Sequence, residues 1–267
     1  MNILNRIFYK KRKFYDDDFD WESYTADSYK RRLIGDVEKD HDVIAKSTEL
    51  TFDPETGHVI KQGRSLHPNQ HLIYEVIGQL QPASVHEVGC GAADHLGNAV
   101  AFYPNTQFSG SDRGATQLDL ARNRHPELKD RLKLQDITMP FSRQWPKSDL
   151  IYSQAVLMHI HTAVSHFVAL CNMVNMANNY VLLMENYQCH NFVQDIIGLR
   201  DGGHLAWDET HIYRFDGSTG ARVILLSRTP LDYDELTSDA QIRAGLDPSR
   251  RRLNRAAEDS SRATFGY

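Results

Sequence analysis

Apolar residues show two kinds of spacing along the middle of the chain, one typical of helices and one typical of strands. Between residues 70 and 80 they recur at the three- and four-residue spacing of an amphipathic helix, which we expect to end before Pro82. Beyond it, short β-prone runs take turns with helical stretches. Strands are expected at 84–88, 107–111, 132–134, 149–153 and 180–184, and helices from residue 95, at 115–124 and at 162–176. Such alternation predicts a parallel sheet with helices on its faces.

Shorter elements flank this core. Residues 50–64 hold two β-prone runs around a turn, which predicts a small hairpin. Residues 191–199 predict another helix, and strands at 211–215 and 221–227 would complete the sheet. No internal repeat interrupts the pattern.

The two ends of the chain are polar. Residues 1–46 mix a basic and an acidic cluster with aromatic side chains. This composition predicts an arm that packs on the main domain, or else a lid or partner-docking arm. From residue 232 onward we expect a helical or poorly ordered tail. The predicted organisation is therefore an N-terminal extension (1–66), a main domain (67–231) and a C-terminal tail (232–267).

Composition narrows the function classes. With 267 residues, 41% of them hydrophobic, the chain can bury a full core, and its net charge of -5 gives no general attraction to nucleic acid phosphates. The three cysteines, Cys90, Cys171 and Cys189, form no CxxC pair, which argues against a disulfide framework or a cysteine-based zinc site. No apolar run approaches the roughly 20 residues that span a bilayer, and the amino terminus lacks the apolar core of a secretory signal. We expect a cytoplasmic protein.

A glycine-rich segment follows the first strand of the predicted sheet. Residues 87–94 read EVGCGAAD, in which Gly89 and Gly91 allow a sharp turn and close approach of a ligand to the backbone. A dinucleotide site would need a third glycine where Asp94 stands, and a carboxylate there opposes a pyrophosphate. Glu87, two residues before Gly89, instead suits a ligand that carries an amino group.

From here the chain resembles the class I S-adenosylmethionine-dependent methyltransferases over residues 70–185. An acid followed by a glycine-rich loop is their first motif, although Ala93 stands where the family often has a third glycine. The resemblance implies that Asp112, after the second strand, accepts the ribose hydroxyls. It also implies that Asp136 and Ile137 adjoin the adenine, and that Ser153 contacts the cofactor from the fourth-strand motif DLIYSQAVLMHI.

The resemblance also implies a fold and a cofactor. We expect an α/β, Rossmann-like methyltransferase fold whose mostly parallel seven-stranded sheet has helices on both faces and an antiparallel last strand. The N-terminal extension would add helical or hairpin structure. The cofactor would be S-adenosylmethionine (SAM), with S-adenosylhomocysteine as its product.

Methyl transfer to a hydroxyl needs a group that removes the proton, and histidine suits this task near neutral pH. We expect His190, in the polar cluster after the fifth strand, to be the general base and His159 to line the pocket. A metal is not expected: Glu185 and Asn186 are similar to the acidic pair of metal-dependent catechol methyltransferases, but the fourth strand lacks their acid.

Three functions remain open from the sequence. The first is an O-methyltransferase acting on a hydroxylated small molecule or on a glycan such as a polysaccharide terminus; the second is an N-methyltransferase acting on a small amine or a protein. The third is a non-catalytic SAM-binding or partner-binding module. The Asn/Asp-Pro-Pro-Tyr motif of many nucleic acid methyltransferases is absent after Ile151 and Tyr152, so we expect no nucleic acid partner. A homodimer remains an option.

Overall fold

The structure is a computed structural model, and it describes residues 50–61, 67–162, 164–218 and 220–246. The predicted arm or lid of residues 1–46 and the arginines at 250–252 lie outside the described residues. The predicted hairpin is present: β1 (Leu50–Asp53) and β2 (His58–Lys61) pair antiparallel as a separate two-stranded sheet.

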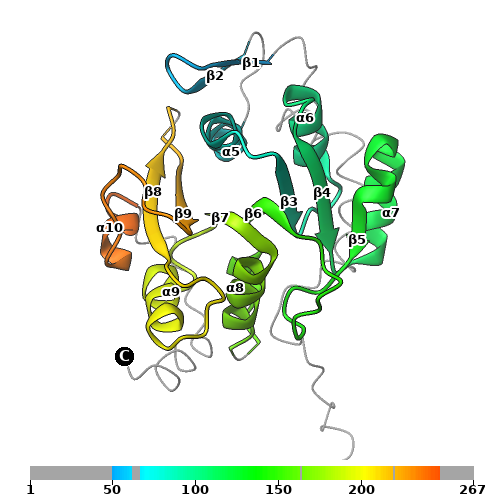
Figure 1. Cartoon of the computed structure of the whole chain (residues 1–267). Helices are drawn as coiled ribbons and strands as arrows, with labels where there is room; N and C mark the ends of the chain where they lie inside the picture. Colours follow the sequence, from blue (N-terminus) through cyan, green and yellow to red (C-terminus); the bar gives the residue numbers. More distant parts are fainter. Residues whose placement is uncertain (1–49, 62–66, 163, 219, 247–267) are drawn as a thin grey trace, which may run out of the picture.

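The main sheet has seven strands in the order β5-β4-β3-β6-β7-β9-β8 (Figure 1). Neighbouring strands are parallel from β5 through β7, whereas β9 runs antiparallel to both β7 and β8. This is the sheet that the resemblance implied, so the predicted Rossmann-like methyltransferase fold is confirmed. The strands are β3 (Ser84–Val88), β4 (Gln107–Asp112), β5 (Leu132–Leu134), β6 (Ser148–Gln154), β7 (Ala177–Met184), β8 (His211–Asp216) and β9 (Arg222–Ser227).

Helices cover both faces of the sheet and bury two hydrophobic clusters against it. Alternate strand residues point to opposite faces, so Leu182 packs in one cluster while its neighbours Val181 and Leu183 pack in the other. One face carries α5 (Pro68–Leu80), α6 (Asp94–Phe102) and α7 (Ala115–Arg124); the other carries α8 (Ser165–Met176) and α9 (Phe192–Asp201). Because both faces are buried, β7 and β9 carry continuous apolar runs, at residues 181–184 and 223–226, in place of an alternating pattern.

The order of the strands creates the crevice in which a ligand can bind. After β3 the chain builds outward through β4 and β5, and it then crosses back to place β6 on the other side of β3. The connections that leave β3 and β6 therefore diverge at their carboxyl ends. Ligands of open α/β sheets bind at this reversal point.

The start of the predicted tail belongs to the folded domain. Residues 239–243 form α10 (Asp239–Arg243), which begins with a capping box between Ser238 and Gln241. The carboxylate of Asp239 accepts hydrogen bonds from the backbone N–H groups of Val193 and Gln194, at 3.1 and 3.0 Å, in the first turn of α9. The polar composition of this stretch therefore serves contacts between elements.

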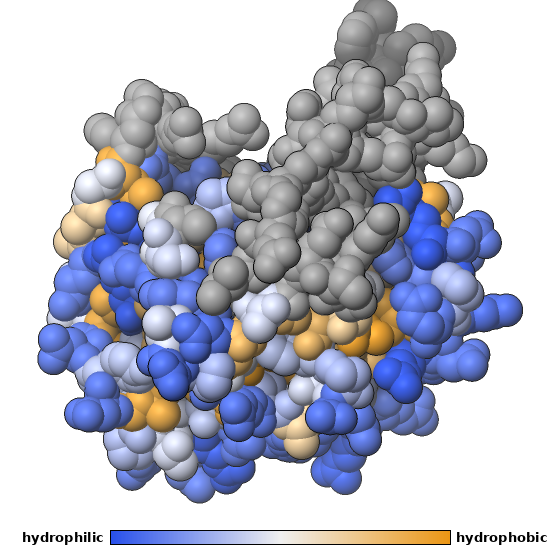
Figure 2. Space-filling model, turned by 90° about the horizontal axis from the view of Figure 1, so that it is seen from above, coloured by the Kyte–Doolittle hydropathy of each residue, from blue (hydrophilic) through white to orange (hydrophobic). Residues whose placement is uncertain are grey.

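The face seen in Figure 2 is mostly hydrophilic, with smaller apolar patches between the polar side chains. Among the described residues, Leu134, Met139 and Tyr233 are the large apolar side chains that are most exposed. No helix in the described part of the chain combines the length and apolar character needed to cross a membrane.

Candidate functional site

A cavity of about 370 Å³ opens at the carboxyl ends of the central strands. Its wall includes the glycine-rich segment after β3, the ends of β4 and β6, and the loop after β5. Helices α5 and α6 add side chains from their first turns. Of the nine residues predicted for the site, seven line this cavity: Glu87, Gly89, Gly91, Asp112, Asp136, Ile137 and His159.

The glycine-rich loop is held in a conformation that most residues avoid. Gly89 and Gly91 have φ angles of 70° and 52°. The N–H of Gly89 donates to the carbonyl oxygen of Ser111 at 2.7 Å, so the loop is fixed to β4. A Cβ atom at Gly89 would lie 2.4 Å from a methyl carbon of Val156, in the turn after β6. The two loops that line the cavity therefore touch at this glycine.

Ala93 occupies the position at which the family often has glycine, and its φ of 59° shows why. The residue lies in the left-handed region as the N-cap of α6, where alanine is strained but sterically tolerated. The departure from the family's motif therefore leaves the turn intact.

Asp112 is the carboxylate that orders the loop around the cavity. Its Oδ2 accepts a hydrogen bond from the N–H of Gly91 at 3.0 Å, and its Oδ1 accepts one from the N–H of Gly114 at 2.7 Å. Burial raises the pKa of Asp112, and these N–H donors oppose the shift. Each oxygen can accept a second bond, so the carboxylate keeps capacity for a ligand's hydroxyl groups.

Glu87 is the most isolated carboxylate of the wall. Its side chain is 2% exposed, and its Oε2 has no hydrogen-bond partner among the described residues. Burial raises the pKa of Glu87 to about 8, and the hydroxyl of Tyr152 opposes the shift. A buried carboxylate oxygen without a donor, such as Oε2, gains strongly from a cationic ligand, because the ligand supplies both charge and N–H donors.

The loop after β5 is shaped by polar side chains at both of its ends. Oδ1 of Asp136 accepts hydrogen bonds from the N–H and the hydroxyl of Thr138, at 2.9 and 2.6 Å, which closes a local turn. Asn172 on α8 donates to the carbonyl oxygens of Ile137 and Met139, both at 2.7 Å. Asn172 was not predicted from the sequence, since nothing in α8 links it to a loop more than 30 residues earlier.

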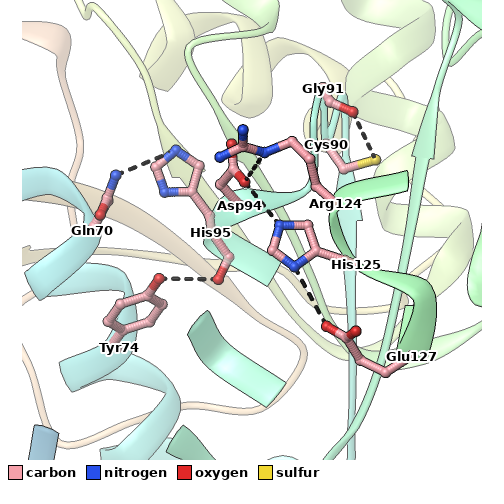
Figure 3. A network of polar contacts seen from close by, with 9 residues as sticks. All are labelled: Gln70, Tyr74, Cys90, Gly91, Asp94, His95, Arg124, His125 and Glu127. Carbon is pink, nitrogen blue, oxygen red and sulfur yellow. Dashed lines mark hydrogen bonds and ion pairs between the residues drawn. The ribbon is translucent and has the colours of Figure 1, made fainter. Parts of the chain in front are cut away.

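Asp94, whose role the sequence left open, anchors the start of α6 (Figure 3). Its Oδ1 lies 2.8 Å from Nε of Arg124 and 2.8 Å from Nε2 of His125. Nδ1 of His125 lies 3.4 Å from Oε1 of Glu127. Gly97 gives His125 its place, because a Cβ there would be 2.3 Å from Nδ1 of that ring. The charge of Asp94 is thus matched within the protein.

Ser153, which was predicted to contact the cofactor, does not line the cavity. Its side chain is fully buried, and its hydroxyl donates to Oε1 of Glu185 at 2.7 Å. Glu185 also accepts from the N–H groups of Val156 and Met158, at 3.1 Å each. Ser153 therefore helps to hold the turn after β6 from behind.

The two predicted catalytic histidines fall on opposite sides of that turn. His159 lines the cavity, at the end of the short 3-10 helix Leu157–His159. His190 lies behind it, 5% exposed and outside the cavity wall, with Nε2 3.0 Å from the carbonyl oxygen of Leu157. Its ring stacks on His166 at 4.3 Å, and burial lowers the pKa of His190. This geometry argues against His190 as the base, and only His159 keeps a place at the site.

Sequence reasoning missed the polar side chains that α5 and α6 contribute to the cavity. His67, Gln70 and His95 all belong to its wall. His67 caps α5, and its Nδ1 accepts from the N–H of Asn69 at 3.3 Å. The sequence signal that could have placed them at the site was their position at the starts of α5 and α6, the two helices before and after β3.

The described residues contain no group of three or more histidine, cysteine or acidic side chains that could hold a metal ion. Glu185 and Asn186, the pair compared above with the acidic pair of metal-dependent methyltransferases, both make hydrogen bonds within the protein. Glu185 accepts from the turn after β6, and Oδ1 of Asn186 accepts from the N–H of Gln188 at 3.1 Å.

No family model matches the chain, and no curated protein matches it. Among solved structures it is similar to the magnesium protoporphyrin IX methyltransferase of Synechocystis, crystallised with bound SAM, at 12% identity over 78% of this chain and 95% of that one, with a TM-score of 0.45.

It is also similar to the methyltransferase domain of a bacterial CtHen1, at 12% identity over 60% of this chain and 96% of that one, with a TM-score of 0.48. The N-methyltransferase NodS of Bradyrhizobium japonicum shares 17% identity over 60% of this chain and 86% of its own, with a TM-score of 0.40. These likenesses are too distant to carry over an activity or a substrate.

Proposed function

We propose that the protein is a SAM-dependent methyltransferase. One observation carries the proposal: Glu87, Asp112 and Asp136, which come from the ends of three different strands, all line one cavity beside the strained glycine-rich loop. A scaffold has no need for three carboxylates at one strand edge, since burying charge costs free energy unless a ligand or partner compensates it.

The residues of the wall fit the chemical groups of SAM. Glu87 offers a buried carboxylate oxygen without a donor, which suits the methionine ammonium. Asp112 is held by two backbone N–H groups and can accept the ribose hydroxyls. Asp136 and Ile137 would adjoin the adenine, on a loop that Asn172 fixes from behind. The bound cofactor supplies a methyl group already activated by a sulfonium.

For the acceptor we propose a hydroxyl group of a small molecule or glycan. The protein's part in such a transfer is to align the acceptor oxygen with the methyl group and to take its proton. His159 is the candidate base, because its turn is held by Glu185 on one side and packs on Gly89 through Val156 on the other. His67 and His95 add polar character to the wall.

An amine acceptor is the second candidate. Apart from Asp94, whose charge Arg124 matches, the wall carries three acidic residues (Glu87, Asp112 and Asp136) and one arginine, Arg113, so its charge would favour a cationic acceptor. An amine needs less help in losing its proton than a hydroxyl does. His159→Ala should therefore abolish most transfer to a hydroxyl and spare most transfer to an amine, measured with methyl-labelled SAM against sugar and amine acceptor panels.

Calorimetric titration of SAM and S-adenosylhomocysteine tests the cofactor site. We expect micromolar binding to the wild type and at least tenfold weaker binding to Asp112→Ala, a change of about 1.4 kcal/mol. Asp149→Ala is the matched control: Asp149 also accepts from two backbone N–H groups, those of Ala83 and Ser84 at 3.0 and 3.3 Å, but lies outside the cavity wall. Absence of binding to the wild type would contradict the proposal and favour a non-catalytic module.

A further inference from the structure

Gln70 is a buried polar residue whose position the cofactor motifs do not explain. It lies in the first turn of α5, it is 5% exposed, and it belongs to the cavity wall. Its Oε1 has no hydrogen-bond partner among the described residues. A buried amide oxygen without a donor costs about 1–3 kcal/mol, so a ligand that supplies the donor would gain that free energy.

The other end of the Gln70 amide is held by the protein. Nε2 of Gln70 lies 3.4 Å from Nε2 of His95, in the first turn of α6 (Figure 3). The hydroxyl of Tyr74 donates to the carbonyl oxygen of His95 at 3.0 Å, which ties α6 to α5. Gln70 thus has one amide end fixed within the protein and one end unmet.

Gln70 shares a wall with Glu87. Both residues line the same cavity, one from the first turn of α5 and the other from β3. Each presents a buried oxygen, Oε1 of Gln70 and Oε2 of Glu87, that has no hydrogen-bond partner among the described residues.

We propose that Gln70 and Glu87 together hold the ammonium group of the cofactor's amino-acid end. An ammonium has three N–H donors and a positive charge, which matches one amide oxygen and one carboxylate oxygen without protein donors. This inference rests on the proposed function. It extends the site beyond the strand ends by assigning a role to a residue of α5.

The test compares two ligands that share the same adenosine. S-adenosylhomocysteine carries the amino-acid end, and 5′-methylthioadenosine lacks it. The variant Gln70→Met keeps the length of the side chain and removes the amide. By calorimetry we expect it to bind S-adenosylhomocysteine at least about tenfold more weakly, as for one lost hydrogen bond to a charged group, and to bind 5′-methylthioadenosine within about twofold of the wild type.

Gln135 provides the matched control. It is also a cavity-wall glutamine, 7% exposed, whose Oε1 lacks a hydrogen-bond partner among the described residues, but it follows β5 beside Asp136. Gln135→Met should change the affinities for both ligands by a similar factor. Gln70→Glu, which keeps an acceptor oxygen, should retain the preference for S-adenosylhomocysteine.

Other results overturn the inference. If Gln70→Met weakens the binding of both ligands equally, or changes the affinity for neither, Gln70 does not contact the amino-acid end of the cofactor. Should Gln70→Met fail to fold, loss of the preference in Gln70→Glu would have the same meaning. Wild-type protein that binds neither ligand would refute the proposed function itself, whereas wild-type binding with no effect of Gln70 refutes the inference alone.

Discussion

Asp112 and Glu185 are carboxylates at strand ends with different roles, one facing the cavity and one holding the fold together. Both accept hydrogen bonds from backbone N–H groups, and burial raises the pKa of each. Asp112 has one backbone donor on each oxygen and lines the cavity. Glu185 receives the Ser153 hydroxyl and the N–H groups of Val156 and Met158, and lies outside the cavity wall. The first can still accept a ligand's donors, whereas the second is committed to the fold.

The largest expected effect follows from removing the committed carboxylate. Glu185→Ala would leave the buried Ser153 hydroxyl and the part-buried N–H groups of Val156 and Met158 without their acceptor, so we expect the free energy of unfolding to fall by about 3 kcal/mol. Asp112→Ala frees only two donors at the edge of the cavity and should destabilise less while it weakens cofactor binding. Urea denaturation of both variants measures the difference, and a larger loss of stability in Asp112→Ala would break the comparison.

Each half of the sheet also buries a histidine, and protonation of either one should destabilise the fold. His86, in the half with Asp112, has Ser109 and Ser111 hydroxyls at 2.8 and 2.9 Å from its ring nitrogens; His166, in the half with Glu185, lies 3.4 Å from Oδ2 of Asp195. Burial lowers the pKa of each histidine to about 3.

The sign of the pH effect follows from these values. Between pH 6.5 and 3 the unfolded chain binds more protons than the folded one, so stability falls as the pH is lowered. We expect about 2 kcal/mol lost per histidine between pH 7 and pH 5, measured by urea unfolding at constant ionic strength. His166→Gln should show a shallower pH dependence than the wild type, and an identical slope would contradict this assignment.

The smallest effect concerns the glycine-rich loop itself. Gly89→Ala would place its Cβ 2.4 Å from Val156, whereas a Cβ at Gly91 would meet only Oε1 of Gln117, at 3.7 Å. Both glycines have positive φ, so each substitution adds about 1 kcal/mol of backbone strain, but only the first adds a clash. We expect Gly89→Ala to weaken SAM binding about tenfold or more and Gly91→Ala less, by calorimetry. Equal losses would show that strain alone matters.

Local patterns in the sequence predicted most of the fold. The strands at 84–88 and 132–134 and the helix at 115–124 match the structure at both ends, because periodicity and flanking turn residues are local properties. The glycine-rich loop could also be predicted from the sequence, since its positive φ angles require small residues. The turn after β6 and the start of α10 were harder to predict from the sequence, because contacts between distant segments define them.

Side-chain direction was the main quantity that the sequence did not reveal. Ser153 and His190 follow the same strand edge as Asp112, yet both turn toward the protein interior. In β6, Ser153 has the same parity as the buried Ile151, which packs against α8, and this parity was the available signal. The contribution of Gln70 could not be predicted, because it depends on how α5 packs beside β3.

The contact between Gly89 and Val156 also constrains how the two positions can change over evolutionary time. A side chain at position 89 fits only where position 156 has first become small, because the opposite order passes through an intermediate with a Cβ 2.4 Å from a methyl group. Even then, the φ of 70° restricts position 89 to residues that tolerate left-handed backbone, such as asparagine. The order in which substitutions arise is thus set by one steric contact between two segments that are distant in the sequence.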